Sequence, residues 1–319
     1  MTQSVSNNPV PGPTLSIIIV AWNTRELLAQ CLESFCQEVQ ALQAAGVETL
    51  VVDNSSRDGS AQMVRERFPW VKLIENQTNL GFARGNNQAV HQSRGRYVLL
   101  LNPDTEVKAG ALQKLVGFME AHPRAGGAGA RLLNPDGTLQ PSCYQEPTLP
   151  REFWRMFHLD AVIPYGAYRM ATWDLDKPRP VEVVQGACLI LRREVLNQVG
   201  LLDEGYFIYS EEVDLCHRLR QAGWGLYWVP QAQVVHYGGQ STKQVAADMF
   251  LQLYGGKIRY FRKHYGQPAT WVYKSILGAA TLSRLLITPL AWLESPARRE
   301  QHFTLASHYR RLLSSLPGM

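Results

Sequence analysis

Cysteine is scarce in this sequence, and its five residues form neither a CxxC pair nor a cluster with metal-ligand spacing. An odd number of scattered cysteines is not the pattern of a disulfide framework, so we interpret them as reduced residues that pack in the interior. Residues 1–13 lack both a basic start and an apolar run, which indicates a disordered leader rather than a signal peptide. The sequence therefore favours a cytoplasmic protein that is not exported.

A block of charge of one sign is also missing. The 319 residues include 32 Lys and Arg against 27 Asp and Glu, for a net charge of +5 that is spread along the chain. This balance gives no reason to expect a nucleic-acid partner, although an anionic substrate or a membrane surface would suit it. With 45% hydrophobic residues, the chain can bury the core of one large α/β domain with an appendage.

Short β-rich runs alternate with helical stretches in the first half of the chain, which predicts an α/β fold with an open, mostly parallel sheet between helices. Strands are predicted at residues 15–21, 47–52, 71–75 and 97–101, and helices directly after the first strand and at 60–67 and 82–92. Farther along, the pattern predicts strands at 181–192 and 228–237 and a helix at 212–222. The proline-rich stretch 141–180 is interpreted as a variable surface segment.

The last part of the chain, residues 241–319, has a helical pattern. Lys274 and Arg284 interrupt its apolar window at 271–292, so we interpret this window as a helix at a membrane interface rather than one that spans the membrane. Basic residues next to aromatic ones suggest a surface that docks on anionic lipid: Arg259, Arg262, Lys263 and His264 beside Tyr254, Tyr260, Phe261 and Tyr265. A packed helical cap or a dimer interface explains the same pattern equally well.

Polar clusters at residues 53–56 and 102–104 follow two predicted strands, and ligands of open α/β sheets bind outside the carboxyl ends of the strands. Asp53 could accept hydrogen bonds from a pyrimidine N–H or a ribose hydroxyl, or it could simply form a turn. Asp104 offers the hard oxygen ligand that Mg²⁺ or Mn²⁺ binds, and His236, after another apolar strand, could complete that site. A plain Asn-Pro-Asp turn and a hydrogen-bonded core histidine are the structural alternatives.

Acidic residues open one predicted helix. Glu211, Glu212 and Asp214 stand in its first turn, where the helix dipole stabilises carboxylates. That effect accounts for two of them and leaves one as a candidate general base, whose pKa would rise if it were buried beside aromatic residues. Another helix start carries Arg84 in the glycine-containing segment 79–85, a combination suited to phosphate, although it is neither a Walker loop nor a GxGxxG motif.

Taken together, the order and spacing of these motifs resemble the family 2 inverting glycosyltransferases of the GT-A fold, most of all the rhamnosyltransferase-like branch of bacterial cell-surface polysaccharide synthesis. The resemblance covers roughly residues 14–240 and rests on the motifs at 15–23, 51–56, 76–87, 100–104, 185–187, 211–214 and 236. It implies a GT-A domain over 14–240 and a C-terminal helical region over 241–319.

The resemblance also implies roles for individual residues in binding. Asp53 and Arg84 would contact the base and the ribose of a nucleotide sugar, and Gln185 and Gly186 would line the pocket for donor and acceptor. Asp104 would be the last residue of a DxD-type metal motif. His236 would be a further metal ligand, and Asn102 stands where many relatives have the first aspartate, which leaves Asp104 as the only carboxylate of the motif.

By the same resemblance Glu212 would be the catalytic base. It stands where the family motif Glu-Asp-x-Asp has its first aspartate, so Glu211 and Asp214 are kept as alternative bases. The expected reaction is a single in-line displacement that inverts the anomeric carbon. The carboxylate would remove the proton of an acceptor hydroxyl, and Mg²⁺ or Mn²⁺ would offset the charge of the departing diphosphate.

We expect dTDP-rhamnose as the donor and a glycan or lipid-linked acceptor, with the enzyme in the cytoplasm or peripheral on the inner face of the cytoplasmic membrane. Two other classes stay open. A nucleotidylyltransferase would need a Gly-rich, basic phosphate loop after the first strand, and residues 21–25 are a poor version of one. A scaffold that binds nucleotide sugar or glycan without chemistry would fit the changes at Asn102 and Glu212, and it would bind the donor without turnover.

Overall fold

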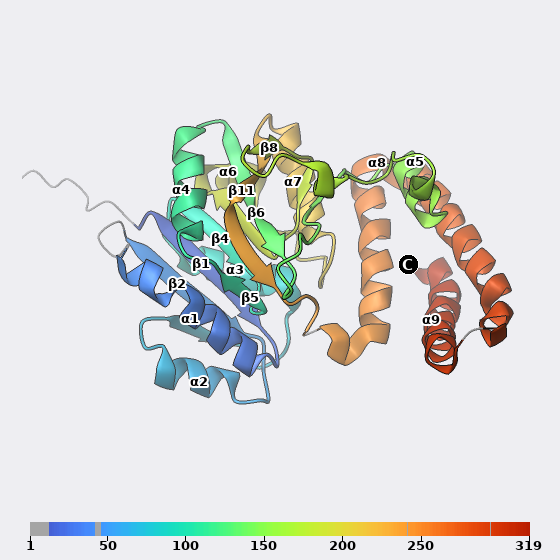
Figure 1. Cartoon of the computed structure of the whole chain (residues 1–319), viewed down its shortest axis with the longest axis horizontal. Helices are drawn as coiled ribbons and strands as arrows, with labels where there is room; N and C mark the ends of the chain where they lie inside the picture. The colour runs from blue at the N-terminus through green and yellow to red at the C-terminus, as the bar shows by residue number, and fades with distance from the viewer. Residues whose placement is uncertain (1–12, 42–45, 241, 294) are drawn as a thin grey trace, which may run out of the picture.

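The computed structural model describes residues 13–41, 46–240, 242–293 and 295–319, so the expected leader lies outside the described residues except for Pro13. Within them, nine strands form one mixed sheet in the order β3-β2-β1-β4-β10-β6-β11-β5, with β8 paired to β11 (Figure 1). The strands are β1 (Leu15–Ala21), β2 (Val47–Asp53), β3 (Lys72–Glu75), β4 (Tyr97–Leu101), β5 (Thr105–Val107), β6 (Ala125–Leu133), β8 (Arg179–Pro180), β10 (Cys188–Arg192) and β11 (Gly225–His236).

The predicted strands of the parallel half are confirmed, and the strand predicted at 228–237 is observed as β11 in the other half of the sheet. β1, β2, β3 and β4 all run parallel, so their carboxyl ends meet along one edge. The other half is mixed because β10 runs antiparallel between β4 and β6, and β5 runs antiparallel to β11. Strand β6 escaped prediction since its sequence, AGGAGARLL, lacks the β-branched and aromatic residues that are typical of strands.

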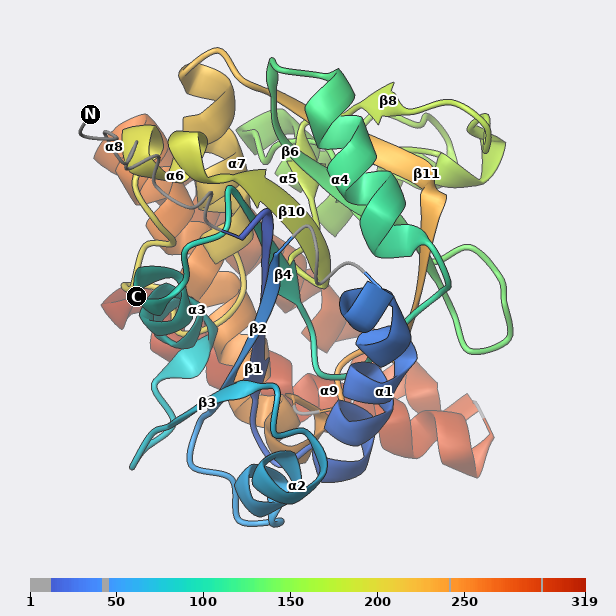
Figure 2. The ribbon, with the colours of Figure 1, turned by 90° about the vertical axis from the view of Figure 1, so that its left-hand side faces the viewer.

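Helices cover both faces of the sheet (Figure 2). One face carries α1 (Arg25–Ala41), α2 (Ser60–Arg67) and α4 (Ala111–Ala121), and the other carries α3 (Gly81–Gln92), α6 (Arg193–Val199) and α7 (Glu211–Gln221). Ile17 and Ile19 of β1 belong to the core on the first face, whereas Ile18 and Val20 belong to the core on the second. Burial on both faces explains why β1 is apolar without alternation.

Two predictions for the middle of the chain are wrong in detail. The strand expected at 181–192 is broken at residues 185–187 into β9 (Val183–Val184) and β10, and β9 pairs with β7 (Cys143–Tyr144) in a separate small sheet. The stretch 141–180 is not simply a variable surface segment. It contains α5 (Leu149–Met156), in which Glu152 and Met156 are buried against the C-terminal helices.

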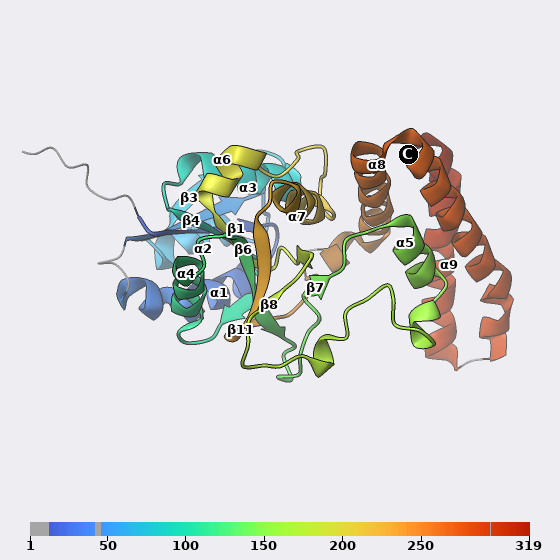
Figure 3. The same ribbon diagram turned by 90° about the horizontal axis from the view of Figure 1, so that it is seen from above.

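The C-terminal helical region is confirmed and consists of α8 (Ala246–Ile287) and α9 (Pro296–Ser315). The chain folds back inside α8 at Gly266, whose φ of 79° is open to glycine, with Pro268 two residues later. Phe261 and Tyr273, on either side of this bend, stack with ring centroids 4.6 Å apart. With α5 and α9 the two halves of α8 enclose a third core beside the sheet domain (Figure 3).

Candidate active site

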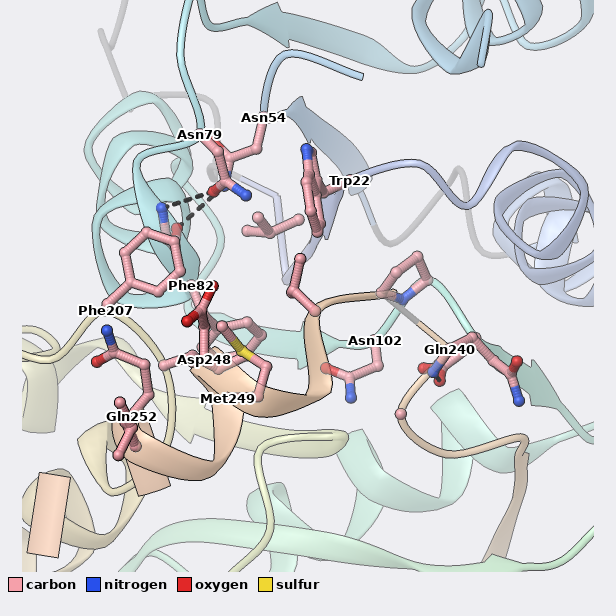
Figure 4. A pocket seen from close by; sticks show the side chains of 18 of the residues that line it. Trp22, Asn54, Asn79, Phe82, Asn102, Phe207, Gln240, Asp248, Met249 and Gln252 are labelled. Carbon is pink, nitrogen blue, oxygen red and sulfur yellow. Dashed lines mark hydrogen bonds between the residues drawn. The ribbon is translucent and has the colours of Figure 1, made fainter. Parts of the chain in front are cut away.

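A cavity of about 550 Å³ opens at the carboxyl ends of the parallel strands. Residues after β1, β2 and β4 and after β11 line one side of it, and residues of α8 and α9 line the other. Figure 4 shows side chains of both groups facing the same space, among them Trp22, Asn54 and Asn102 from the strand ends and Asp248 and Gln252 from α8. The sheet edge that the sequence singled out therefore borders a cavity.

The backbone around this edge is held in an unusual conformation. Five non-glycine residues among those described have positive φ, and four of them border the site. Asn23 and Ser55 follow β1 and β2, and Tyr209 and Ser210 stand directly before the acidic start of α7. Such strain costs of order 1 to 3 kcal/mol per residue and persists where surrounding structure enforces it, most often at functional sites.

Asp104 and His236 meet at one wall of the cavity. His236 Nε2 lies 3.4 Å from an Asp104 carboxylate oxygen, and both side chains are less than one tenth exposed. Burial opposes ionisation of Asp104, but the hydrogen bond and charge of His236 outweigh it and hold the pKa of this carboxyl below its usual value. A backbone N–H of Gln240 adds to the same effect at 3.4 Å.

Gln140 orients the imidazole from behind. Its Nε2 donates to Asn134 Oδ1 and to the carbonyl oxygen of His236, so its Oε1 is left to accept from His236 Nδ1 at 2.6 Å. A proton on Nδ1 leaves the lone pair of Nε2 facing Asp104 whenever the ring is neutral. In that state Nε2 can accept from the amide nitrogen of Asn102 or bind a cation that Asp104 shares.

These residues fit a divalent cation as a partial ligand set. A carboxylate oxygen and an imidazole nitrogen held by a hydrogen bond at its far side are the groups that bind Mg²⁺ or Mn²⁺ in proteins. Asn102 lies against the same imidazole, with its amide nitrogen 3.4 Å from Nε2. The described residues contain no group of three His, Cys, Asp or Glu side chains that could hold a metal ion, so phosphate oxygens would have to supply further ligands.

Glu211 and Glu212 stand together at the start of α7. Each has a buried carboxylate oxygen without a hydrogen-bond partner among the described residues. Burial raises the pKa of both, and repulsion by Glu212 raises that of Glu211 further. A Cβ at Gly186 would lie 3.6 Å from the ring of Phe82, which lines the cavity, and 3.7 Å from Glu212 Cβ. Gly186 thus lies between Phe82 of the cavity wall and Glu212, which is not itself among the described residues that line the cavity.

Asp214 has a different environment from its two neighbours. Its side chain is fully buried and binds Arg218 at 2.8 Å, Lys263 at 2.7 Å and His264 at 2.7 Å. Although burial opposes ionisation, these partners hold the pKa of Asp214 far below its usual value. Arg218 and Lys263, together with His264, make it a link between the sheet domain and the C-terminal helices rather than a free base.

The remaining predicted residues Asp53, Gln185 and Arg84 are all outside the set of described residues that line the cavity. Asp53 is buried at the end of β2, where one oxygen accepts from Ser56 N at 3.0 Å and the other has no partner among the described residues. Gln185 also has a buried, unpartnered side-chain oxygen. Arg84 is not among the residues that line the cavity; it is exposed on α3, 3.5 Å from Glu204.

Several lining residues were missed by the sequence reasoning. Trp22 could have been found, because it directly follows a buried strand, and Gln240 follows β11 in the same way. Gln140, Asp248 and Arg311 gave no signal. Gln140, which contacts His236 without lining the cavity, follows β6, and Asp248 and Arg311 reach the site from the C-terminal helices, which are distant from it in the sequence.

Most of the basic and aromatic residues that were expected to dock on lipid instead form ion pairs and hydrogen bonds with other residues of the chain. Arg259 and Lys263 bind Asp203 at 3.0 and 2.7 Å, His264 binds Asp214, and Tyr260 donates to Glu146 at 2.9 Å. The packed helical cap, weighed equally against lipid docking, is therefore the better account of this half of α8. None of the five cysteines, all of which the structure describes, forms a disulfide, and four are buried.

Solved structures with the same fold cover most of the chain. A mannosyltransferase from Pyrobaculum calidifontis in complex with GDP-Man and Mn²⁺ superposes with a TM-score of 0.56 at 17% identity, covering 97% of this chain and 85% of the other. GalNAc-T7 with UDP, GalNAc and Mn²⁺ superposes with a TM-score of 0.53, also at 17% identity, over 70% of this chain and 44% of the other. The expected GT-A fold is confirmed.

Sequence comparison agrees with the fold. The profile of glycosyl transferase family 2 matches residues 16–200. The N-acetylglucosaminyl-diphospho-decaprenol L-rhamnosyltransferase of Mycobacterium tuberculosis is 34% identical over 230 residues, which cover 66% of this chain and 73% of that protein. Rhamnosyltransferase WbbL of Escherichia coli is 24% identical over 57% of this chain and 70% of its own length. The chain belongs to glycosyl transferase family 2 and is a glycosyltransferase.

Proposed function

We propose that this enzyme transfers rhamnose from dTDP-rhamnose to a lipid-linked glycan acceptor with inversion at the anomeric carbon. The observation that carries the proposal is the place of Glu212 at the start of α7, half-buried, with a raised pKa and next to Gly186. The 34% identical rhamnosyltransferase, whose name specifies a diphospho-decaprenol acceptor, supports the choice of donor and acceptor. Such an enzyme would work on the cytoplasmic side of the membrane that holds the lipid.

The residues divide the chemistry between them. Glu212 would accept the proton of the acceptor hydroxyl as this oxygen attacks the sugar, and burial raises its pKa toward the range that a general base needs. Asp104 and His236 would hold Mg²⁺ or Mn²⁺, which when bound offsets the negative charge of the nucleotide diphosphate. Asp53, Gln185 and Gly186 would contact the nucleotide sugar from the strand ends.

A transfer assay tests this proposal. A panel of nucleotide sugars that includes dTDP-rhamnose is offered with Mg²⁺ or Mn²⁺ to the wild type and to Glu212→Gln, and the product anomer is determined by NMR. We expect Glu212→Gln to bind donor as the wild type does but to transfer at least about 100-fold more slowly. Glu194→Gln, an exposed acid in the first turn of α6, is the matched control and should keep full activity.

Each other outcome has a distinct meaning. Full transfer by Glu212→Gln would refute its role as base, and a retained anomeric configuration would refute inversion. Donor binding by the wild type without turnover would favour the scaffold alternative. Release of pyrophosphate from a nucleoside triphosphate and a sugar phosphate would favour a nucleotidylyltransferase.

We further propose that an apolar face of the second half of α8 and η5 (Thr288–Leu293) rests on anionic lipid. The apolar face consists of the exposed residues Trp271, Val272, Leu282, Leu286, Ile287, Leu290 and Trp292. A cation lies over the tryptophan near each end, Lys274 over Trp271 at 5.3 Å and Arg299 over Trp292 at 4.6 Å. Tryptophan with Lys or Arg at the rim of an apolar helix face is typical of interfacial helices.

The segment Ala246–Trp292 has the length and composition of a membrane span, and only 22% of its most apolar stretch is buried. Because the chain bends at Gly266, this segment is not one straight helix, and we propose that it lies on the membrane surface rather than across the membrane. Sedimentation with phosphatidylglycerol vesicles should therefore be lost in a Leu286→Ser, Leu290→Ser variant and kept in Leu175→Ser, which changes an exposed leucine of the sheet domain. Equal binding of both variants would contradict the proposal.

A further inference from the structure

The cavity contains an imbalance of charge. Two carboxylates line it, Asp104 from the end of β4 and Asp248 from α8. Arg311 of α9 is the only Lys, Arg or His side chain among the described residues that line it. A nucleotide diphosphate brings at least two further negative charges, so the site needs cationic groups in addition to any metal ion at Asp104.

Arg311 is placed to serve that need. Its neighbour Leu312 is fully buried and Tyr309 nearly so, which fixes this part of α9 in the core formed with α8. The guanidinium binds Asp248 at 2.7 Å, but the pair is open to solvent, with 51% of the Arg311 side chain and 60% of the Asp248 side chain exposed. An exposed pair of this kind contributes roughly 0 to 1 kcal/mol and can be exchanged for a stronger partner.

We propose that Arg311 binds the diphosphate of the nucleotide-sugar donor, exchanging its contact with Asp248 for phosphate oxygens when the donor enters. The inference rests on the proposed function and assigns to α9 the cationic contact that the sequence pattern placed at Arg84. A planar guanidinium can bind two phosphate oxygens at once through parallel hydrogen bonds. Asp248 holds the arginine in position while the cavity has no anion.

This assignment makes the C-terminal helices part of the donor site. The profile of the family ends at residue 200, and Arg311 lies more than one hundred residues beyond that point. Release of the diphosphate after transfer would return Arg311 to Asp248. Arg311 would thus bind the donor, and its renewed contact with Asp248 would favour departure of the nucleoside diphosphate. No covalent step at Arg311 is involved.

Binding of dTDP and UDP to the full chain, measured by titration calorimetry with and without Mn²⁺, tests the inference. We expect Arg311→Gln to weaken nucleoside diphosphate binding by about 10-fold or more, since hydrogen bonds to charged groups contribute about 1.5 to 3 kcal/mol. Arg311→Lys should recover part of the loss. Arg310→Gln is the matched control, because Arg310 is an exposed neighbour that does not line the cavity, and it should bind within about twofold of the wild type.

Asp248→Asn separates phosphate binding from helix packing. It removes the same ion pair but keeps the cation, so it should bind dTDP at least as well as the wild type. An equal loss in Asp248→Asn and Arg311→Gln would overturn the inference, as would binding by Arg311→Gln that matches Arg310→Gln. A wild-type chain that binds no nucleoside diphosphate would overturn the proposed function, and this inference with it.

Discussion

Glu146 joins the sheet domain to the C-terminal helices, and its replacement should loosen that junction. The residue lies between β7 and α5, with its side chain only 12% exposed. It accepts hydrogen bonds from Tyr260 at 2.9 Å and Tyr265 at 3.2 Å, both on α8, and contacts His217 and Arg220 of α7. Glu146→Gln keeps the shape of the side chain but removes the charge on which all four partners converge.

The magnitude follows from the pKa. Burial opposes ionisation, but the hydrogen bond and charge of His217 and the contacts of Tyr260 and Arg220 outweigh it and lower the pKa of Glu146 from 4.5 to about 2. A change of this size corresponds to about 3 kcal/mol of stability. Because the folded-state pKa is depressed, the contribution is complete above the unfolded pKa of 4.5 and is lost as the pH falls toward 2. Roughly 1 kcal/mol should be gone at pH 4.

Urea unfolding at pH 7 and pH 4 measures this contribution. We expect the free energy of unfolding of Glu146→Gln to be about 3 kcal/mol lower than that of the wild type at pH 7. This difference should be about 1 kcal/mol smaller at pH 4. Glu120→Gln removes a carboxylate from an exposed pair with Arg96 and should cost less than about 1 kcal/mol. Equal losses in the two variants, or a difference that does not depend on pH, would refute the reasoning.

Three further outcomes follow from the site. Gln140→Leu removes the acceptor of His236 Nδ1–H, so Mn²⁺ binding should weaken by about 10- to 100-fold in calorimetry, whereas Gln140→Glu should keep most of the affinity. Equal Mn²⁺ affinities of Gln140→Leu and the wild type would contradict the role of Gln140 in orienting His236 as a metal ligand. Because burial raises the pKa of Glu212, kcat/KM should rise with pH through a value above 4.5, and a profile that is flat across the acid range would argue against this base. Gly81→Ala places a methyl group against the carbonyl oxygen of Phe207 at a φ of 82°, so urea unfolding should show about 1 to 3 kcal/mol more destabilisation than for Gly137→Ala, which has the same φ in open space.

The GT-A resemblance could be read from the sequence because its signals are local. A buried parallel strand is an unbroken apolar run, and the residues that follow it must lie at the ligand edge of the sheet. Asn102, Asp104 and the start of α7 were located in this way, and the structure brings Asp104 to His236 across 132 residues. The strand predicted at 181–192 is two strands in the structure, because a run of apolar residues does not reveal that the chain passes from the small sheet of β9 to the main sheet of β10 at residues 185–187.

What the sequence determined by itself was the family, the parallel half of the sheet and the acidic and metal-binding candidates at its edge. Only the tertiary structure decided that Asp214 is held by Arg218, Lys263 and His264, that Arg84 pairs with Glu204, and that Arg311 reaches the cavity. The physical reason is that periodicity and strand ends are properties of a short stretch of chain. The partner of a charged side chain depends on which distant helices pack beside it, and no local pattern records that packing.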